Sequence, residues 1–121
     1  MEANPLLRLK VEVENIHDKK VIVLFFSGKI NSDNVFDINQ RVKKVFEDGI
    51  YDCIIHLSEL EYLNSTGIAM FLTIARTIDQ NGGKLILTKP SDFVKDLFDL
   101  TDLESRFQFV ETIDEAKALF K

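Results

Sequence analysis

Apolar and polar residues alternate at the start of the chain. From residue 7 to residue 13 every second position is apolar, and charged side chains stand between them. This period of two predicts a half-exposed strand, because successive side chains of a strand point to opposite faces. Residues 15–19 are polar and turn-like, whereas residues 21–26 form an unbroken apolar run that predicts a strand buried on both faces. The short link between the two strands predicts a hairpin.

Apolar residues then recur at helical spacing. Residues 35–46 show this spacing with charged residues between them, and Gly49 is well placed to end the helix. A second helix is predicted to begin near Ser65 and to stop at residues 81–83. Its predicted inner stripe consists of Ile68, Phe71, Leu72, Ala75 and Ile78.

Two shorter helices are predicted in the last third of the chain. Thr112 and Glu115 have the spacing of a capping box, which predicts a final helix to residue 120. The other helix opens at Ser91, and its predicted inner residues are Phe93, Val94, Leu97 and Phe98.

Short apolar runs over residues 53–57, 85–87 and 107–110 predict the remaining strands. The resulting order is β-β-α-β-α-β-α-β-α. Alternating strands and helices imply right-handed crossovers, so the predicted fold class is α/β, with a mostly parallel central sheet and an N-terminal antiparallel hairpin. Sites in open α/β sheets gather at the carboxyl ends of the strands. Here that rim comprises residues 28–34, 58–66, 89–92 and 110–112.

Composition adds limits to this picture. The chain has 121 residues, 45% hydrophobic and 29% charged, as in a soluble globular protein. We expect one domain over residues 1–121, with a core from about residue 6 to residue 120. The net charge of −5 gives no attraction to nucleic acid, and the longest apolar run is too short for membrane insertion. The lone Cys53 and the lack of a recognisable signal peptide predict a cytoplasmic location.

The most informative segment, residues 57–67, joins a buried strand to the second helix. Asn64, Ser65 and Thr66 can each cap a helix, because their side chains accept hydrogen bonds from unpaired backbone N–H groups. The same position suits phosphorylation, because free N–H groups and the helix dipole stabilise an anion at a helix N-terminus. Spacing alone leaves both interpretations open.

Residue patterns give little support to catalysis or metal binding. Of the two histidines, His17 lies in the first turn, and no acid is clearly placed to orient His56 for a nucleophile at Ser65. The pair Gly82-Gly83 follows a helix, whereas a P-loop follows a strand. We therefore expect no enzyme activity, no metal and no cofactor. A solvated helix face explains the acidic series of Asp92, Asp96, Asp99 and Asp102 better than a metal site does.

Several segments together resemble the STAS family, which includes anti-sigma factor antagonists and the cytoplasmic tails of sulfate transporters. The resemblance covers nearly the whole chain and rests on the order and spacing of its pieces. They are the opening hairpin, Ser27-Gly28-Lys29-Ile30-Asn31, Leu57-Ser58-x-Leu60-x-x-Leu63, Asn64-Ser65-Thr66-Gly67, Asn81-Gly82-Gly83-Lys84-Leu85, Val94-x-x-Leu97-Phe98 and Leu100-Thr101-x-Leu103.

The resemblance implies a phosphorylation switch. In anti-sigma factor antagonists, an anti-sigma factor serine kinase phosphorylates the serine of an Asp-Ser-Ser/Thr-Gly loop, and that role maps onto Ser65. The unphosphorylated antagonist binds the kinase and frees the sigma factor, and a phosphoserine phosphatase restores it. Asn64 and Asn31 stand where this family usually has Asp. Both departures remove negative charge from the rim and would fit an atypical kinase or a constitutive binder.

We expect the partner to dock around Ser65. At about 100° per residue, one side of the second helix lies opposite the predicted inner stripe and carries Met70. Methionine adapts well to binding surfaces, so Met70 is predicted to anchor the partner, although exposed apolar residues are routine. The predicted partner-binding set is Asn31, Ser32, Asn64, Thr66, Met70 and Thr73.

Two other interpretations of the same family resemblance stay open. The main alternative is an interaction or scaffold module that binds its partner without being phosphorylated. A sensor that holds a nucleotide or lipid in the rim crevice is the other, and the sequence carries no positive signal for it.

Overall fold

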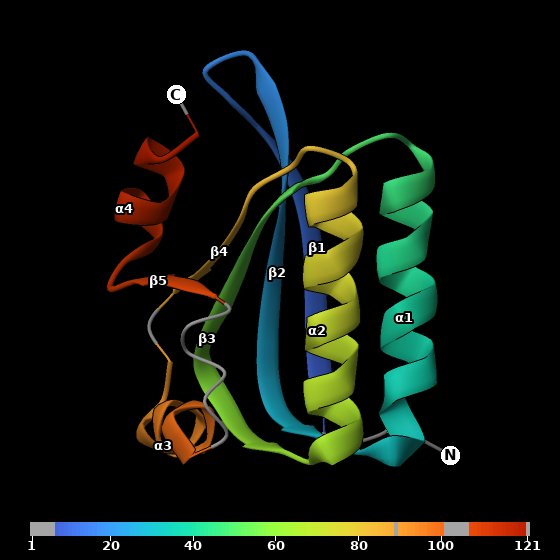
Figure 1. Ribbon diagram of the computed structural model, residues 1–121, viewed down its shortest axis with the longest axis vertical. Helices are drawn as coiled ribbons and strands as arrows, with labels where there is room; N and C mark the ends of the chain where they lie inside the picture. Colours follow the sequence, from blue (N-terminus) through green and yellow to red (C-terminus); the bar gives the residue numbers. More distant parts are fainter. Residues whose placement is uncertain (1–6, 89, 101–106, 121) are drawn as a thin grey trace.

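A mixed sheet of five strands forms the centre of the protein, and helices cover both of its faces (Figure 1). The computed structural model describes residues 7–88, 90–100 and 107–120. The strands lie across the sheet in chain order, with β1 antiparallel to β2 and the other pairs parallel, so the predicted α/β fold class and element order are confirmed. The elements are β1 (Leu7–Ile16), β2 (Lys19–Ile30), α1 (Ser32–Glu47), β3 (Asp52–Leu63), α2 (Ser65–Gln80), β4 (Leu85–Thr88), α3 (Asp92–Leu100), β5 (Gln108–Val110) and α4 (Ile113–Ala118).

The opening hairpin turns within two residues. Ile16 pairs with Lys19, and between them His17 and Asp18 have φ angles of 49° and 69°. Positive φ at both central residues is typical of a type I′ turn, whose twist matches that of the flanking strands. The predicted hairpin is confirmed, and it places β1 at one edge of the sheet.

Successive residues of β2 point to opposite faces of the sheet, and both faces are buried. Ile22 and Leu24 belong to the main core, which α1 and α2 cover and to which α3 adds Val94. Val21 and Val23 belong to a smaller core on the other face, covered by α4. The prediction that this strand is buried on both faces is therefore confirmed. In Figure 1, α1 and α2 lie side by side over one face, and α4 lies apart from them.

Both β2 and β3 extend further than the sequence pattern predicts. The pattern breaks at residues 27–30, and residues 58–63 resemble a connecting loop, yet both segments continue their strands. The pairing of β2 with β3 shifts register twice, and β3 contributes one extra residue at each shift, as in a β-bulge. Buried residues therefore recur at every third position of β3 in this segment, at Leu57, Leu60 and Leu63. A search for a period of two misses such a strand.

Helix α2 buries a different stripe from the predicted one. Met70 is 3% exposed and belongs to the main core, so the prediction that it faces outward is wrong. Apolar residues surround more than half of this helix, and their spacing alone does not fix its rotation. Three predicted inner residues, Ile68, Leu72 and Ala75, are only partly buried. The buried residues of α2 are Gly67, Met70, Phe71, Ile74 and Ile78.

The rotation of α2 is set by a close approach at Gly67. A Cβ atom at this position would lie 2.3 Å from Cδ1 of Leu63 and 2.9 Å from Cγ2 of Ile30, which leaves no room for a side chain. The first turn of α2 can therefore rest on the ends of β2 and β3 only because residue 67 is glycine. With Gly67 facing the sheet, Met70 follows about one turn later on the same side.

Cys53 lies in the middle of the sheet with 0% exposure. Burial raises the pKa of its thiol far above the ordinary value, and the negative charge of Asp52 adds a smaller contribution in the same direction. The thiol therefore stays protonated and inert in the folded protein.

Candidate functional site

The N-termini of α1 and α2 meet where β2 and β3 end, at the bottom of Figure 1. Asn31 caps α1: its side-chain oxygen accepts a hydrogen bond from the backbone N–H of Asp33 at 2.9 Å. The backbone N–H of Asn31 in turn donates to Oδ1 of Asn34 at 3.0 Å, which completes a capping box. Asn34 is buried, and its Nδ2 donates to the carbonyl of Lys29 at 3.0 Å, so the capping box is also tied to the end of β2.

Asn64 caps α2 and also links the two helices. Its Oδ1 accepts from the backbone N–H of Gly67 at 2.9 Å, and its Nδ2 donates to Oγ of Ser32 at 3.2 Å. The hydroxyl groups of Ser32 and Thr66 lie 3.2 Å apart and share a hydrogen bond. The backbone N–H of Asn64 donates to the carbonyl of Ile30 at 3.2 Å. This network fixes the start of α2 against the end of β2 and the start of α1.

Ser65 is the first residue of α2 and its side chain is exposed. Among the described residues, its hydroxyl makes no hydrogen bond, whereas the residues on either side of it are held in the network. A helix N-terminus has unpaired backbone N–H groups and a positive electrostatic potential. The geometry therefore presents a free hydroxyl at a position that favours an anion.

The predicted site residues divide into three groups. Asn31, Ser32, Asn64 and Thr66 gather around Ser65, as expected for the rim. Thr73 is exposed but lies two turns further along α2, where its hydroxyl donates to the carbonyl of Ala69 at 3.0 Å. Met70, the remaining residue of the predicted set, is buried and does not belong to this surface.

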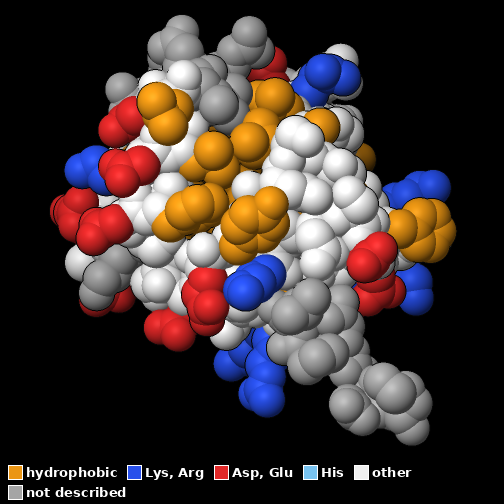
Figure 2. Space-filling model, turned by 90° about the horizontal axis from the view of Figure 1, so that it is seen from below, with side chains coloured by type: hydrophobic (Ala, Val, Ile, Leu, Met, Phe, Trp, Pro, Cys, Tyr) orange, Lys and Arg blue, Asp and Glu red, His pale blue; other side chains and the backbone are white. Residues whose placement is uncertain are grey.

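An exposed aromatic pair lies at the same end of the molecule, and sequence reasoning did not single it out. The rings of Tyr62 and Phe93 stack at 5.8 Å between centroids, and the residues are 41% and 43% exposed. Phe93 was predicted to face inward, and the structure corrects this: Val94 and Phe98 are the buried residues of α3. Figure 2 looks onto this end and shows hydrophobic side chains gathered across it. Phe93 stands four residues before the partly buried Leu97, and this spacing placed it close to the predicted inner stripe, which explains the error.

The two histidines lie in different surroundings. His17 is exposed in the turn of the hairpin, at the opposite end of the sheet from Ser65. His56 is within 2.7 Å of two hydroxyl groups, with Ser58 at Nε2 and Thr88 at Nδ1. A hydroxyl group, that of Thr88, therefore lies at Nδ1, where a catalytic triad has a carboxylate.

The described residues contain neither a cluster of metal ligands nor a membrane-spanning helix. Over residues 7–88, 90–100 and 107–120, no three His, Cys, Asp or Glu side chains gather as the ligands of a metal ion would. Within the same ranges, no helix is both long enough and apolar enough to cross a membrane. Asp92, Asp96 and Asp99 are exposed along α3, and Asp102 lies outside the described residues.

Comparisons with known proteins agree with this fold. The anti-sigma-B factor antagonist of Staphylococcus aureus is 23% identical over 96 residues, which cover 79% of this chain and 89% of the relative. A crystal structure of an anti-sigma factor antagonist from Mycobacterium paratuberculosis matches with a TM-score of 0.76 at 22% identity, over 98% of this chain and 97% of that chain. SpoIIAA of Bacillus, in its phosphorylated form, matches with a TM-score of 0.72 at 20% identity, over 94% and 100%.

These solved structures share the fold, and the family comparison spans most of the sequence. The family model described as the STAS domain matches residues 11–116. This range contains both capped helix starts and all the strands except the first residues of β1. The resemblance noted from sequence segments is confirmed, and the chain belongs to the STAS domain family.

Proposed function

We propose that this protein is an anti-sigma factor antagonist that is switched by phosphorylation of Ser65. In its unphosphorylated form it binds an anti-sigma factor serine kinase through the surface around the start of α2. The observation that carries the proposal is the exposed, unbonded hydroxyl of Ser65 beside a fixed network of Ser32, Asn64 and Thr66. The name of the Staphylococcus aureus relative and the solved phosphorylated and unphosphorylated forms of SpoIIAA support the same function.

The start of α2 can accept a phosphate without a change of fold. Phosphorylation adds roughly −1.5 to −2 charges and three acceptor oxygens. The unpaired N–H groups and the dipole of α2 stabilise that charge, and Ser65 is exposed, so nothing in the core has to move. The switch then works by adding charge and bulk to the docking surface. A phosphatase that removes the phosphate returns the surface to its binding form.

The stacked pair of Tyr62 and Phe93 takes the anchoring role that the sequence prediction gave to Met70. Aromatic side chains supply large contact areas at protein interfaces and lose little conformational entropy there. Tyr62 is the second-last residue of β3, three residues before Ser65, so a partner that covers Ser65 also covers this pair. Changing both Tyr62 and Phe93 to alanine is expected to weaken kinase binding at least tenfold while the protein stays folded.

A module that binds without phosphorylation is a second candidate, because one hydrogen bond favours it. The Nδ2 group of Asn64 donates to Oγ of Ser32 at 3.2 Å, whereas an aspartate at this position could only accept a hydrogen bond from that hydroxyl. The amide therefore suits a network that is permanently formed. In this case Asn31 and Asn64 hold one fixed binding surface and Ser65 is an ordinary contact residue.

Phosphorylation assays separate the two candidates. The protein is incubated with ATP and each anti-sigma-type serine kinase of the source bacterium, then analysed by intact mass and phosphopeptide mapping. The switch predicts one phosphate, on Ser65, which disappears in Ser65→Ala and persists in the matched control Thr66→Ala. Binding of the same kinase by calorimetry is expected for wild type and lost for the phosphorylated form. Phosphate on Thr66 alone, or binding without any phosphate transfer, would overturn the switch, and the second result would favour the fixed module.

A further inference from the structure

Strand β1 is the outer strand of the sheet and presents a long free edge. It runs for ten residues and, among the described residues, it pairs only with β2. The strand at the other edge, β5, has three residues. A long edge strand carries a row of unpaired backbone N–H and C=O groups that can accept another strand.

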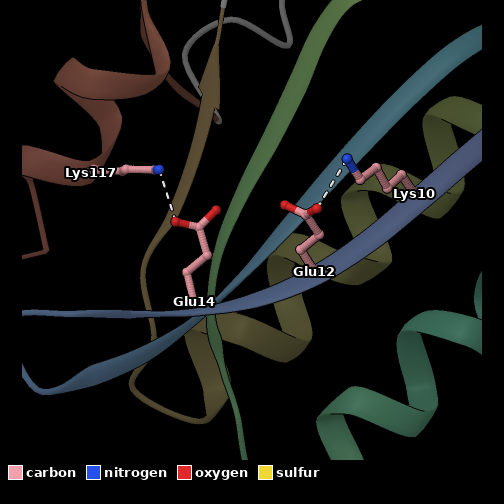
Figure 3. Close-up of polar contacts among 4 residues, drawn as sticks. All are labelled: Lys10, Glu12, Glu14 and Lys117. Atoms are coloured by element: carbon pink, nitrogen blue, oxygen red, sulfur yellow. Dashed lines mark ion pairs between the residues drawn. The ribbon is translucent and has the colours of Figure 1, made fainter.

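One face of β1 carries charges in a self-complementary order. Arg8 and Lys10 stand in the first half, and Glu12 and Glu14 stand in the second half, all on the face that α4 covers in part. Figure 3 shows two ion pairs of this face, Lys10 with Glu12 at 3.0 Å and Glu14 with Lys117 at 2.8 Å. Such a strand has a positive half and a negative half, and an antiparallel copy of it would place opposite charges face to face.

The other face of β1 is apolar and incompletely covered. Leu9 and Val11 pack partly against the main core, but Val13 is 47% exposed. A hollow of about 300 Å³ lies between β1 and α1, lined by Leu9 of the strand and by Ile38 and Arg41 of the helix, among others. The helix-side face of β1 is therefore not completely covered by α1.

We propose that two copies of this chain associate by antiparallel pairing of their β1 strands, centred on Val11. In this register Arg8 of one copy lies opposite Glu14 of the second copy, and Lys10 lies opposite Glu12. The apolar face then brings the exposed Val13 against Leu9 of the second copy. The two sheets join into one continuous sheet across the interface.

Charge order selects this register and direction over others. Antiparallel pairing centred on Lys10 puts Lys10 opposite Lys10 of the second copy, and pairing centred on Glu12 puts Glu12 opposite Glu12. Like charges directly opposite each other destabilise strand pairing. Parallel pairing in register places each charged residue opposite its own copy, and a parallel offset of four residues gives only two opposite-charge pairs. Only the arrangement centred on Val11 gives four opposite-charge pairs across the interface.

One intramolecular contact must be replaced for the strands to pair. Nη1 of Arg41 donates to the carbonyl of Leu9 at 2.8 Å, and both groups are near the surface. In the dimer a backbone N–H of the second copy donates to the carbonyl of Leu9 in place of Arg41, which requires that this carbonyl points away from β2. The exchange makes the association weak, so that it becomes visible only at high protein concentration.

Analytical ultracentrifugation of charge variants tests the proposal. Wild type is expected to form dimers as its concentration rises to about 1 mM, with a dissociation constant that increases with salt. The double variant Glu12→Lys with Glu14→Lys, whose edge is all positive, should dimerise at least tenfold more weakly. The double variant Arg8→Glu with Lys10→Glu, whose edge is all negative, should behave in the same way.

Charge restoration distinguishes edge pairing from any other dimer. The variant with all four substitutions has a self-complementary edge again and should dimerise like the wild type. An equimolar mixture of the two double variants should form heterodimers, while Lys117→Ala, which removes only the intramolecular ion pair, should leave dimerisation unchanged. Folding is checked by circular dichroism. A monomeric wild type at about 1 mM, or a folded fourfold variant that stays monomeric, would overturn the proposal.

Discussion

The two sides of helix α2 differ in how closely they are packed. Its inner side, with Gly67 and Met70, is packed so closely that one additional carbon atom does not fit. Its outer side presents Ser65 and Thr73 to solvent, and among the described residues the Ser65 hydroxyl has no partner. Close packing of the inner side against the sheet thus fixes where the outer side presents its free hydroxyl. A change on the inner side should therefore lower the stability of the protein, and a change on the outer side should alter only recognition.

The largest effect is expected for Met70→Lys. This substitution places an unpaired charge in the main core, which should lower the free energy of unfolding by at least about 3 kcal/mol or prevent folding. Thr73→Lys, on the outer side of the same helix, is the matched control and should change stability by no more than about 0.5 kcal/mol. Urea denaturation measures both variants. Equal stability of the two would contradict the assigned rotation of α2.

The next effect is expected for Gly67→Ala. Alanine normally stabilises a helix relative to glycine, by roughly 0.5–1 kcal/mol. Here its Cβ would meet Leu63 at 2.3 Å, so we expect a loss of about 1–3 kcal/mol from overpacking. Ser65→Ala in the same turn serves as the control and should be nearly neutral. If thermal unfolding shows Gly67→Ala to be more stable than wild type, the side chains of Leu63 and Ile30 can move aside at little cost in free energy.

Smaller losses are expected when the caps are removed. Asn64→Ala should lower stability by about 0.5–2 kcal/mol, because the N–H of Gly67 loses its acceptor and Ser32 loses its donor. Asn64→Asp keeps the acceptor, and together with Asn31→Asp it should change stability by only about 0.5 kcal/mol while altering affinity for the kinase. Calorimetric titration with the kinase checks the second part. A large loss of stability in the aspartate variant would show that the amide donor to Ser32 is structural.

The smallest effect on stability, with a large effect on binding, is expected for Ser65→Asp. A carboxylate at the first position of a helix interacts favourably with the helix dipole, so stability should stay the same or rise by a few tenths of a kcal/mol. Binding of the kinase should weaken at least tenfold, because the charge enters the docking surface. Ser65→Asn, which has the same shape without the charge, is the control. Undiminished binding by Ser65→Asp would exclude charge as the switch.

Sequence reasoning predicted those parts of the molecule that carry a local signal, such as a turn, a cap or a regular period of apolar residues. The β1–β2 hairpin, the end of α1 near Gly49 and the capping box of Thr112 and Glu115 all have local signals, and the structure confirms them. The second half of β3 was missed because two bulges replace the period of two with a period of three.

The candidate site was only partly predictable for a related reason. Its polar residues, from Asn31 to Thr66, were found because capping residues stand at strand-to-helix junctions and can be recognised in a sequence. The rotation of α2 depends on a contact of Gly67 with β2 and β3, which no local pattern reveals. The stacking of Tyr62 on Phe93 likewise joins residues that are far apart in the chain. Long-range packing thus decided which apolar side chains reach the surface.

The buried Cys53 provides a natural probe for the rate at which the centre of the sheet opens. As the single cysteine of the chain, with 0% exposure and a raised pKa, it can react with an alkylating reagent only when the middle of the sheet opens. The labelling rate, followed by mass spectrometry without any engineered probe, therefore measures how often the centre of the sheet becomes accessible. Variants that act only at the surface, such as Ser65→Asp, should label at the wild-type rate, whereas Gly67→Ala should label faster. The same thiol would thus show, in a single time course, whether the switch changes the surface alone or also loosens the sheet beneath it.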